Sequence, residues 1–285
     1  MIRRVAAGVV ILAAVAGVAH ASRRIEAAGA ARSEGAQVLY LPSGRYLKAA
    51  SLGFPELMAD LVYIWSIQYY GHYEAGDRFR YLEHIYGSVI SELDPRYVDP
   101  YLIGSMIMSM EANDPEMALR LLDKGIAANP KEWILAFEAG FVCFHTLHDH
   151  ARAAGYFQKA IDVPGSPAVI RRMHAEMYNK MGDRRTSLRH WQEVMELGEN
   201  AYVRDTASAH IHDLAIEIDL EDLRAAIAAF REHAGAFPPD LDALVRAGLM
   251  ARVPRDPEGL SYAYDPVTGE PSSRSRYRLY RRSGA

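Results

Sequence analysis

The chain has 285 residues, of which 50% are hydrophobic and 24% charged, so one large or two small globular domains are expected rather than a disordered chain. The formal net charge of -4 argues against a general nucleic-acid binder, and no nucleic-acid partner is expected. The single cysteine, Cys143, excludes an intrachain disulfide and any CxxC metal or haem motif.

The first 24 residues have the layout of a bacterial export signal. Two arginines precede an apolar run that begins at Val5, and the small-residue triplet Ala19-His20-Ala21 follows it. The run is short for a spanning helix, which needs about 20 residues. Residues 1–24 are therefore predicted to be either a cleaved signal or an uncleaved anchor that enters the inner membrane through residues 5–22. Both alternatives place the rest of the chain in the periplasm or on the periplasmic side of the inner membrane.

A predicted linker, 25–39, leads to an aromatic-rich helix that begins at Pro55 and ends before Gly71. One face of this helix carries Leu57, Leu61, Ile64 and either Ile67 or Gln68. Its other faces hold an aromatic patch: Tyr63, Trp65, Tyr69 and Tyr70. A helix that is apolar on most sides must be covered on most sides. We therefore expect it either to cap the structure that follows, packed against the segment after Tyr40, or to present the aromatic patch to a partner.

A fixed spacing recurs through the middle of the chain. Within residues 114–130, Ala118, Leu122 and Gly125 share one helical face and a proline follows the helix. The same slots return 34 or 35 residues away, at Ala153, Phe157 and Ala160; at Ser187, Trp191 and Val194; and upstream at Glu83, Gly87 and Ile90. Small residues let two helices approach closely while the large residue fills the space between them. Such a period predicts a solenoid of helix pairs.

The predicted units are a second helix at 78–95, helix pairs at 99–129, 133–163 and 167–198, and a last pair at 201–234 that is divided near Asp219. The pattern resembles the tetratricopeptide repeat (TPR) in the small, aromatic and proline slots of its second helices. The first helices match less well: the family's small slot is occupied by Met106, Phe141 and Ala175. The resemblance implies an all-α, TPR-like solenoid over residues 40–234.

That resemblance also implies a concave groove, lined by the first helices, that receives an extended peptide or a helix of another protein. The groove positions it implies run from apolar to charged: Ile103, Ile107 and Met110; Glu138, Val142 and His145; and Arg172, Glu176, Asn179 and Lys180.

The helical repeat pattern ends at Gly235, and the residue composition changes after it. Residues 235–285 are expected to form a short helix and a β-hairpin around the turn 265–269, followed by a basic tail. This segment resembles the C-terminal part of type II secretion major pseudopilins in Phe237-Pro238, Gly248-Leu249, Val253-Pro254, Asp256-Pro257, Gly259 and Tyr262-x-Tyr264. The N-terminus lacks the prepilin cleavage and methylation signature, so a polymerised subunit is not expected. The arginines at 274–282 suit either contact with anionic lipid headgroups or an acidic partner, or a solvated tail or an edge strand protected by charge.

Little in the sequence points to catalysis. His145, His148, His150 and Asp149 form the densest group of potential metal ligands, although turns collect polar residues as well. No hydrolase, metalloprotease or nucleotide-binding motif is present, so no catalytic residue, metal or cofactor is predicted. The sequence favours a non-enzymatic, exported scaffold of a bacterial envelope assembly such as a secretion or type IV pilus system. The alternatives are an accessory subunit of a large inner-membrane complex, or an envelope protein that binds a metal or small ligand.

Overall fold

The computed structural model describes residue 20 and the ranges 41–71, 78–198 and 200–279. The chain divides into two compact units, Met1–Leu41 and Pro42–Ala285, and all elements given below belong to the second. The predicted signal or anchor at 1–24 and linker at 25–39 lie outside the described residues, apart from His20. No helix in the described part of the chain is both long and apolar enough to cross a membrane.

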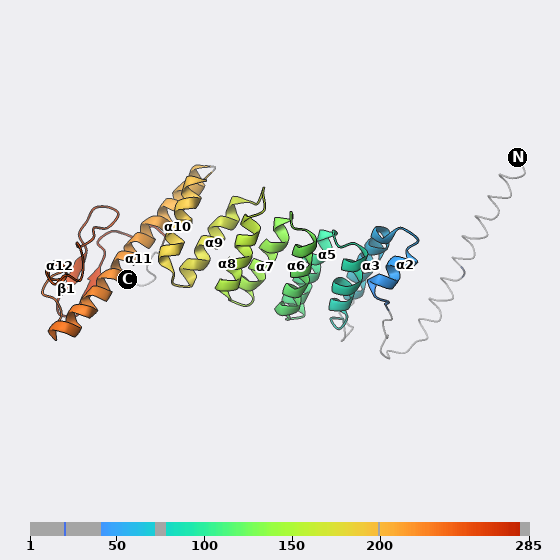
Figure 1. Ribbon diagram of the computed structural model, residues 1–285, viewed down its shortest axis with the longest axis horizontal. Helices are drawn as coiled ribbons and strands as arrows, with labels where there is room; N and C mark the ends of the chain where they lie inside the picture. Colours follow the sequence, from blue (N-terminus) through green and yellow to red (C-terminus); the bar gives the residue numbers. More distant parts are fainter. Residues whose placement is uncertain (1–19, 21–40, 72–77, 199, 280–285) are drawn as a thin grey trace, which may run out of the picture. The chain divides into compact units, whose positions relative to one another are not determined.

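Helices account for most of the second unit and follow one another in chain order (Figure 1). The helices before the repeats are α2 (Gly44–Ala50), α3 (Pro55–Tyr70), the π-helix η1 (Glu83–Ile90) and α4 (Ser91–Leu93). Three helix pairs come next: α5 (Val98–Met106) and the π-helical η2 (Ile107–Glu111) with α6 (Pro115–Ala128); α7 (Trp133–His145) with α8 (His150–Ile161); and α9 (Ala168–Lys180) with α10 (Arg184–Glu196). The unit closes with α11 (Ala201–Ala234), α12 (Asp242–Arg246) and the strands β1 (Ala263–Asp265) and β2 (Glu270–Ser272).

The predicted helix-pair solenoid is confirmed by the successive contacts of α5 to α11. All the small and large residues that the sequence predicts at the interfaces of the three second helices are buried: Ala118, Leu122 and Gly125; Ala153, Phe157 and Ala160; Ser187, Trp191 and Val194. These residues recur on one face because 34 or 35 residues bring the chain back to the same position of the next helix pair. One period of the sequence therefore corresponds to one helix pair, that is, one layer of the solenoid.

Aromatic rings packed directly onto glycines set the close approach of the helices. A Cβ added at Gly125 would lie 2.8 Å from the Tyr101 ring, and one added at Gly140 would lie 2.6 Å from the Phe157 ring. Gly104 faces Tyr86 in the same way, at 2.8 Å. The small residues of the first helices are thus Gly104, Gly140 and Ala175. Met106 and Phe141, which the TPR resemblance aligns with that slot, lie elsewhere on their helices.

The turn between the two helices of each pair repeats as well. An aspartate accepts a hydrogen bond from the backbone N–H three residues later and so caps the second helix, at Asp114, Asp149 and Asp183. A residue with positive φ precedes each cap: Asn113, His148 and Gly182. The cap explains the polar FHTLHDH stretch, in which His148 makes the left-handed turn and Asp149 starts α8.

Polar contacts also join second helices of neighbouring layers, and join α10 to α11. Their partners lie 33 to 37 residues apart in sequence: Glu83 with Arg120, Glu116 with Arg152, Asp123 with Tyr156, Arg184 with Glu221, and Arg185 with Asp222. These side chains are mostly solvent-exposed, so each contact contributes roughly 0.2–1 kcal/mol. Their spacing of about one repeat fixes the register between layers more than it adds stability.

Two expectations about the ends of the repeat array are wrong. In the first upstream unit Ile90 is buried as predicted, but the unit is π-helical over Glu83–Ile90, and its wider turn leaves Glu83 exposed and Gly87 half-buried, while Leu82, Tyr86 and Val89 enter the core. The predicted last pair is a single 34-residue helix, α11. No glycine or proline interrupts it, and Asp219 lies within it, accepting a 2.8 Å hydrogen bond from the Tyr262 hydroxyl.

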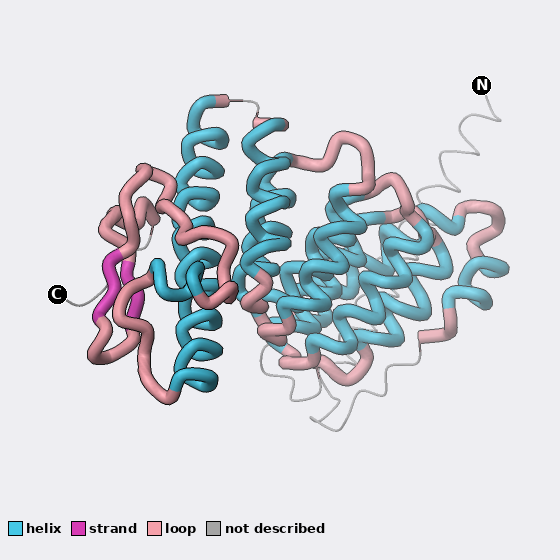
Figure 2. The backbone as a smooth tube through the Cα atoms, turned by 60° about the vertical axis from the view of Figure 1, so that its left-hand side comes forward, coloured by secondary structure: helices cyan, strands magenta, loops and turns pink. Residues whose placement is uncertain are grey.

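The segment after Gly235 folds onto one side of α11 (Figure 2). Its predicted hairpin is present: β1 and β2 are antiparallel, and Tyr264 pairs with Pro271. Ile216, Leu223 and Ile227 of α11 form a core with Leu244 and Tyr262 of the tail. The C-terminal half of α11 is thus covered by the tail instead of by another repeat.

Candidate partner-binding face

The first helix of the middle repeat carries a row of stacked rings. Trp133, Phe137, Phe141 and His145 are each four residues apart on α7, so they lie along one face. The Phe137 and Phe141 centroids are 6.4 Å apart, and those of Phe141 and His145 are 5.4 Å apart with planes inclined by 11°. The three larger rings are half-buried and His145 is exposed. The row is therefore an ordered, partly accessible aromatic surface.

The first helix of the preceding layer carries flexible apolar side chains. α5 neighbours α7, and its Ile103 is half-buried. Met106 is 42% exposed and Met110, on η2, is 66% exposed. Methionine side chains are adaptable and polarizable, which suits them to contacts with partner surfaces of varied shape.

The following layer is polar. Arg172, Glu176 and Asn179 of α9 are half-buried and Lys180 is exposed. Glu176 forms a 3.8 Å ion pair with Lys180 and a 3.3 Å hydrogen bond with Asn179. We name the exposed and half-buried side chains of α5, η2, α7 and α9 the first-helix face. Glu138 lies on it beside the ring row, and burial raises the pKa of its carboxyl above the usual range.

Of the ten residues predicted to line the groove, two are buried and unavailable to a ligand: Ile107 and Val142. At 100° per residue Val142 shares a face with Leu135 and Ala139, which face the core. Ile107 likewise follows Gly104 towards the core. The accessible positions beside them are Met106 and Phe141, which the TPR resemblance assigns to the helix interface.

The aromatic patch predicted on α3 is engaged within the fold. Tyr63, Trp65, Tyr69 and Tyr70 are all half-buried. Tyr63 makes edge contacts with Tyr86 and Tyr97, and Trp65 stacks with Tyr69 at 5.4 Å between centroids. Tyr70 lies against Phe79 and the Arg78 guanidinium. Tyr63 and Tyr70 thus join α3 to η1 and the segments on either side of it, whereas Trp65 and Tyr69 stack on each other within α3.

The histidine group at the end of α7 does not converge on a common point. His145 stacks on Phe141, His148 makes the turn, and His150 packs against Phe144 at 6.1 Å between centroids. Over the described ranges, no three His, Cys, Asp or Glu side chains are arranged to hold a metal ion.

Two other histidines are placed inside the solenoid. His174 lies 4.5 Å from the His190 ring and 5.2 Å from Tyr178, measured between centroids. His210 stacks on Trp191 with centroids 3.7 Å apart. Burial is the main reason that the pKa of each of the two imidazoles is lowered to about 4, and the neighbouring His190 or Arg172 adds to it.

These two histidines predict a loss of stability in weak acid. Between pH 6.5 and 4 the unfolded chain binds protons that the folded chain does not, so stability falls as pH drops through this window. After allowance for solvent screening, we expect the free energy of unfolding to fall by about 1 kcal/mol per histidine from pH 7 to pH 5. Urea denaturation of His210→Phe, which keeps a ring on Trp191, should show a smaller decrease than the wild type. His233→Gln, at an exposed histidine, is the control, and equal pH dependence of all three proteins would contradict the assignment.

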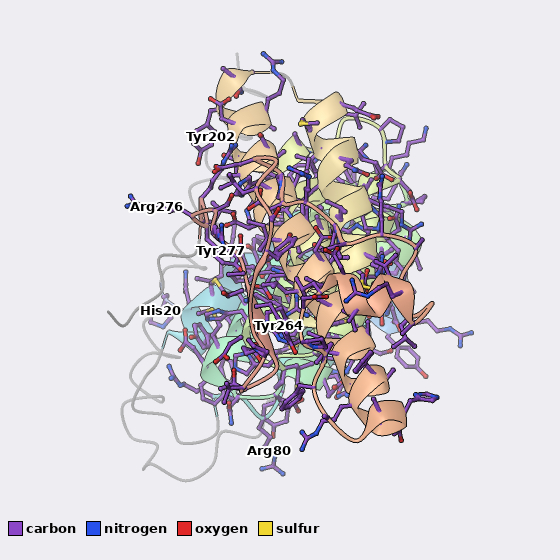
Figure 3. The ribbon with its side chains drawn as sticks, turned by 90° about the vertical axis from the view of Figure 1, so that its left-hand side faces the viewer. His20, Arg80, Tyr202, Tyr264, Arg276 and Tyr277 are labelled. Carbon is purple, nitrogen blue, oxygen red and sulfur yellow. The ribbon has the colours of Figure 1, made fainter. Side chains whose placement is uncertain are left out.

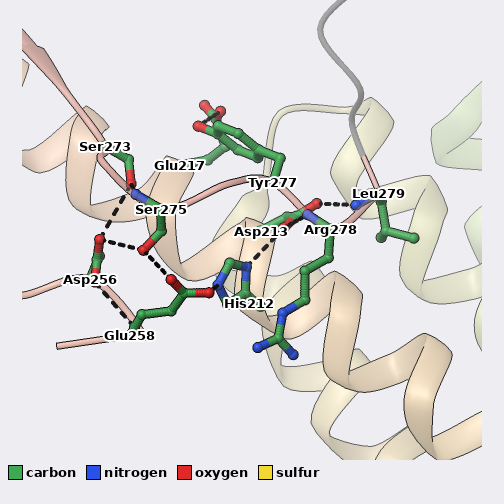
Figure 4. Close-up of polar contacts among 10 residues, drawn as sticks. All are labelled: His212, Asp213, Glu217, Asp256, Glu258, Ser273, Ser275, Tyr277, Arg278 and Leu279. Atoms are coloured by element: carbon green, nitrogen blue, oxygen red, sulfur yellow. Dashed lines mark hydrogen bonds and ion pairs between the residues drawn. The ribbon is translucent and has the colours of Figure 1, made fainter. Parts of the chain in front are cut away.

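The C-terminal tail is held by a polar network on α11 (Figure 4). The buried Asp213 carboxylate accepts the backbone N–H groups of Arg278 and Leu279, both at 2.8 Å, and contacts His212 Nδ1 at 3.0 Å. Figure 3 shows Tyr277 beside this helix, where its hydroxyl donates to Glu217 at 2.5 Å. Arg274, Arg276 and Arg278 are exposed along the same segment.

Two aspartates of the tail, Asp256 and Asp265, form turns. Asp256 accepts hydrogen bonds from the backbone N–H groups of Glu258 and Leu260 and from the Ser275 hydroxyl, which hold the pKa of its carboxyl below the usual range despite burial. Asp265 accepts from the Val267 N–H in the hairpin turn. Their carboxylates therefore have structural partners in the tail.

Comparison with known proteins gives limited similarity. No family model and no curated protein matches the chain. The solved structure of YrrB, described as a TPR protein with an unusual peptide-binding site, is 22% identical over 50% of this chain and 71% of its own, with a TM-score of 0.36. TTC0263, a thermophilic TPR protein in Thermus thermophilus, is 17% identical over 58% of this chain and 94% of its own, with a TM-score of 0.34. TM-scores this low do not establish a shared fold. The assignment of an all-α solenoid therefore depends on the repeated helix pairs described above.

Proposed function

We propose that this protein is a non-enzymatic scaffold that binds an extended peptide or a helix of another protein on its first-helix face. The observation that carries the proposal is the ring row of α7 together with the exposed methionines of the neighbouring first helix, α5 and η2. Groups of partly exposed aromatic and methionine side chains are enriched where proteins bind one another. The polar residues of α9 would meet charged groups at one end of the ligand.

A paired substitution tests this role. We expect Met106→Glu with Met110→Glu to reduce cross-linking to co-purifying partners of the full chain at least roughly tenfold, since two buried charges oppose association. The control is Met195→Glu with Leu197→Glu, which places the same two charges on and just after a second helix, at residues that are 38% and 59% exposed. Quantitative mass spectrometry after cross-linking gives the readout. Equal partner recovery from both variants would exclude the first-helix face.

The envelope setting is a further part of the proposal. The layout of residues 1–24 favours export, with residues 5–22 held in the inner membrane if the segment is not cleaved. The pseudopilin-like spacing of the tail favours a secretion or type IV pilus system as the assembly served. The intact mass of the protein recovered from bacterial membranes distinguishes an anchor from a cleaved signal.

A further inference from the structure

The aliphatic face of α3 is exposed. Leu57, Leu61, Ile64 and Ile67 are 45–56% accessible, whereas the residues that α3 buries are the smaller Ala59, Val62 and Ser66. This is the reverse of the usual arrangement, in which the large aliphatic residues of an amphipathic helix face the core. We name these four residues the α3 stripe.

The stripe and the two apolar residues just before α3 together expose the area that a stable interface needs. With the adjoining Leu52 and Phe54, the exposed fractions correspond to on the order of 700 Å² of surface, close to the roughly 800 Å² that each partner contributes to a standard protein–protein interface. Isolated exposed leucines are ordinary, but a contiguous patch of this size marks a contact site.

The charges of α3 itself argue against an anionic lipid surface as the occupant of the stripe. α3 contains two charged residues, Glu56 and Asp60, and no lysine or arginine. Helices that bind anionic lipid headgroups carry basic residues on their polar face. Both acids lie in the first half of the helix, and its second half carries no charged side chain.

This asymmetry suits a second copy of the same helix in antiparallel orientation. The midpoint between Leu61 and Ile64 coincides with the midpoint of Pro55–Tyr70, so a two-fold axis there would place Leu61 of each copy against Ile64 of the other. Antiparallel pairing sets the acidic half of one helix beside the uncharged half of its partner. Parallel pairing would bring Glu56 and Asp60 next to their own copies, which like-charge repulsion disfavours.

We propose that the α3 stripe is a homodimer interface in which α3 packs antiparallel against α3 of a second copy, with Leu61 and Ile64 at its centre. The spacing of Leu57, Leu61 and Ile64 by four and three residues is that of a two-helix seam. The first-helix face is formed by other helices and is not part of this α3 contact.

The mass of the full chain in a non-denaturing detergent tests the interface. Sedimentation equilibrium, corrected for bound detergent, is expected to give twice the 31.8 kDa of one chain for the wild type. Leu61→Glu and Ile64→Lys should each weaken dimerisation by roughly 100-fold, because either change places two charges at the centre of the contact. Far-UV circular dichroism checks that the variants remain folded, as expected for exposed positions.

A mixture of the two variants separates this proposal from other occupants of the stripe. The glutamate introduced at position 61 of one chain would face the lysine introduced at position 64 of the other, so an equimolar mixture should recover dimers that neither variant forms alone. The control is Val267→Glu, at a residue 83% exposed in the hairpin turn, which should dimerise as the wild type does. A monomeric wild type, unchanged dimerisation of the single variants, or a mixture that stays monomeric would each overturn the proposal; the last two would indicate a different partner helix or a different dimer contact.

Discussion

Replacing Gly140 by alanine is expected to lower the free energy of unfolding by about 2 kcal/mol, although alanine is the better helix former. The new Cβ would lie 2.6 Å from Cδ1 and Cε1 of Phe157, well inside van der Waals contact. Phe157 is fully buried between its own helix and α7, so its ring has no free space to move into. The helices would have to separate, which loses packing along the whole interface.

Gly155 provides the matched control, because it lies in the partner helix α8 of the same repeat. A Cβ at this position meets nothing within 4 Å, so Gly155→Ala should stabilise the protein by about 0.5–1 kcal/mol through helix propensity alone. Urea denaturation followed by circular dichroism measures both variants. If the two substitutions shift stability in the same direction, the close approach at Gly140 does not limit helix packing.

Replacing Asp213 by asparagine is expected to release the C-terminal tail at a cost of about 3 kcal/mol. The carboxylate accepts two backbone N–H groups, from Arg278 and Leu279, and an amide of the same shape can accept only one of them. The other N–H would then face the amide nitrogen, which is also a donor. Because the solenoid layers do not include these bonds, their helical content should remain.

Limited trypsin digestion reports this release, since Arg274, Arg276 and Arg278 lie on the anchored segment. Cleavage there should accelerate in Asp213→Asn while the circular dichroism of the solenoid is retained. Asp205→Asn, at an exposed residue of the same helix, is the control and should be cleaved at the wild-type rate. Unchanged cleavage of Asp213→Asn would show that the tail is held mainly by its apolar core.

The second helices are the most predictable part of the fold. Spacing alone assigns Ala118, Phe157 and Trp191 to the helix interface, and all three are buried there. The assignment succeeds because every layer packs in the same way, so the same position of each second helix needs a residue of similar size. The hairpin at 263–272 is predictable for a local reason, since Asp265 and Gly269 form a tight turn.

The candidate partner-binding site is predictable only to the level of its helices. A shift of one position separates Val142, in the core, from Phe141, on the first-helix face, and the weak hydrophobic periodicity of α7 does not distinguish them. The π-helical stretch at Glu83–Ile90 is not predictable, because its sequence carries no feature that separates a wide turn from a normal one. The predicted break near Asp219 is wrong because no helix-breaking residue supports it.

By itself the sequence determined the period of the repeat, the small and large residues that its second helices bury and the hairpin of the tail. All of these are set by local geometry or by a pattern that recurs along the chain. Only the tertiary structure decided which side of α3 is covered, where α11 continues and which rings of α7 remain accessible. Those outcomes depend on which neighbour removes an apolar surface from water, and a helix that is apolar on several sides does not specify that neighbour in its own sequence.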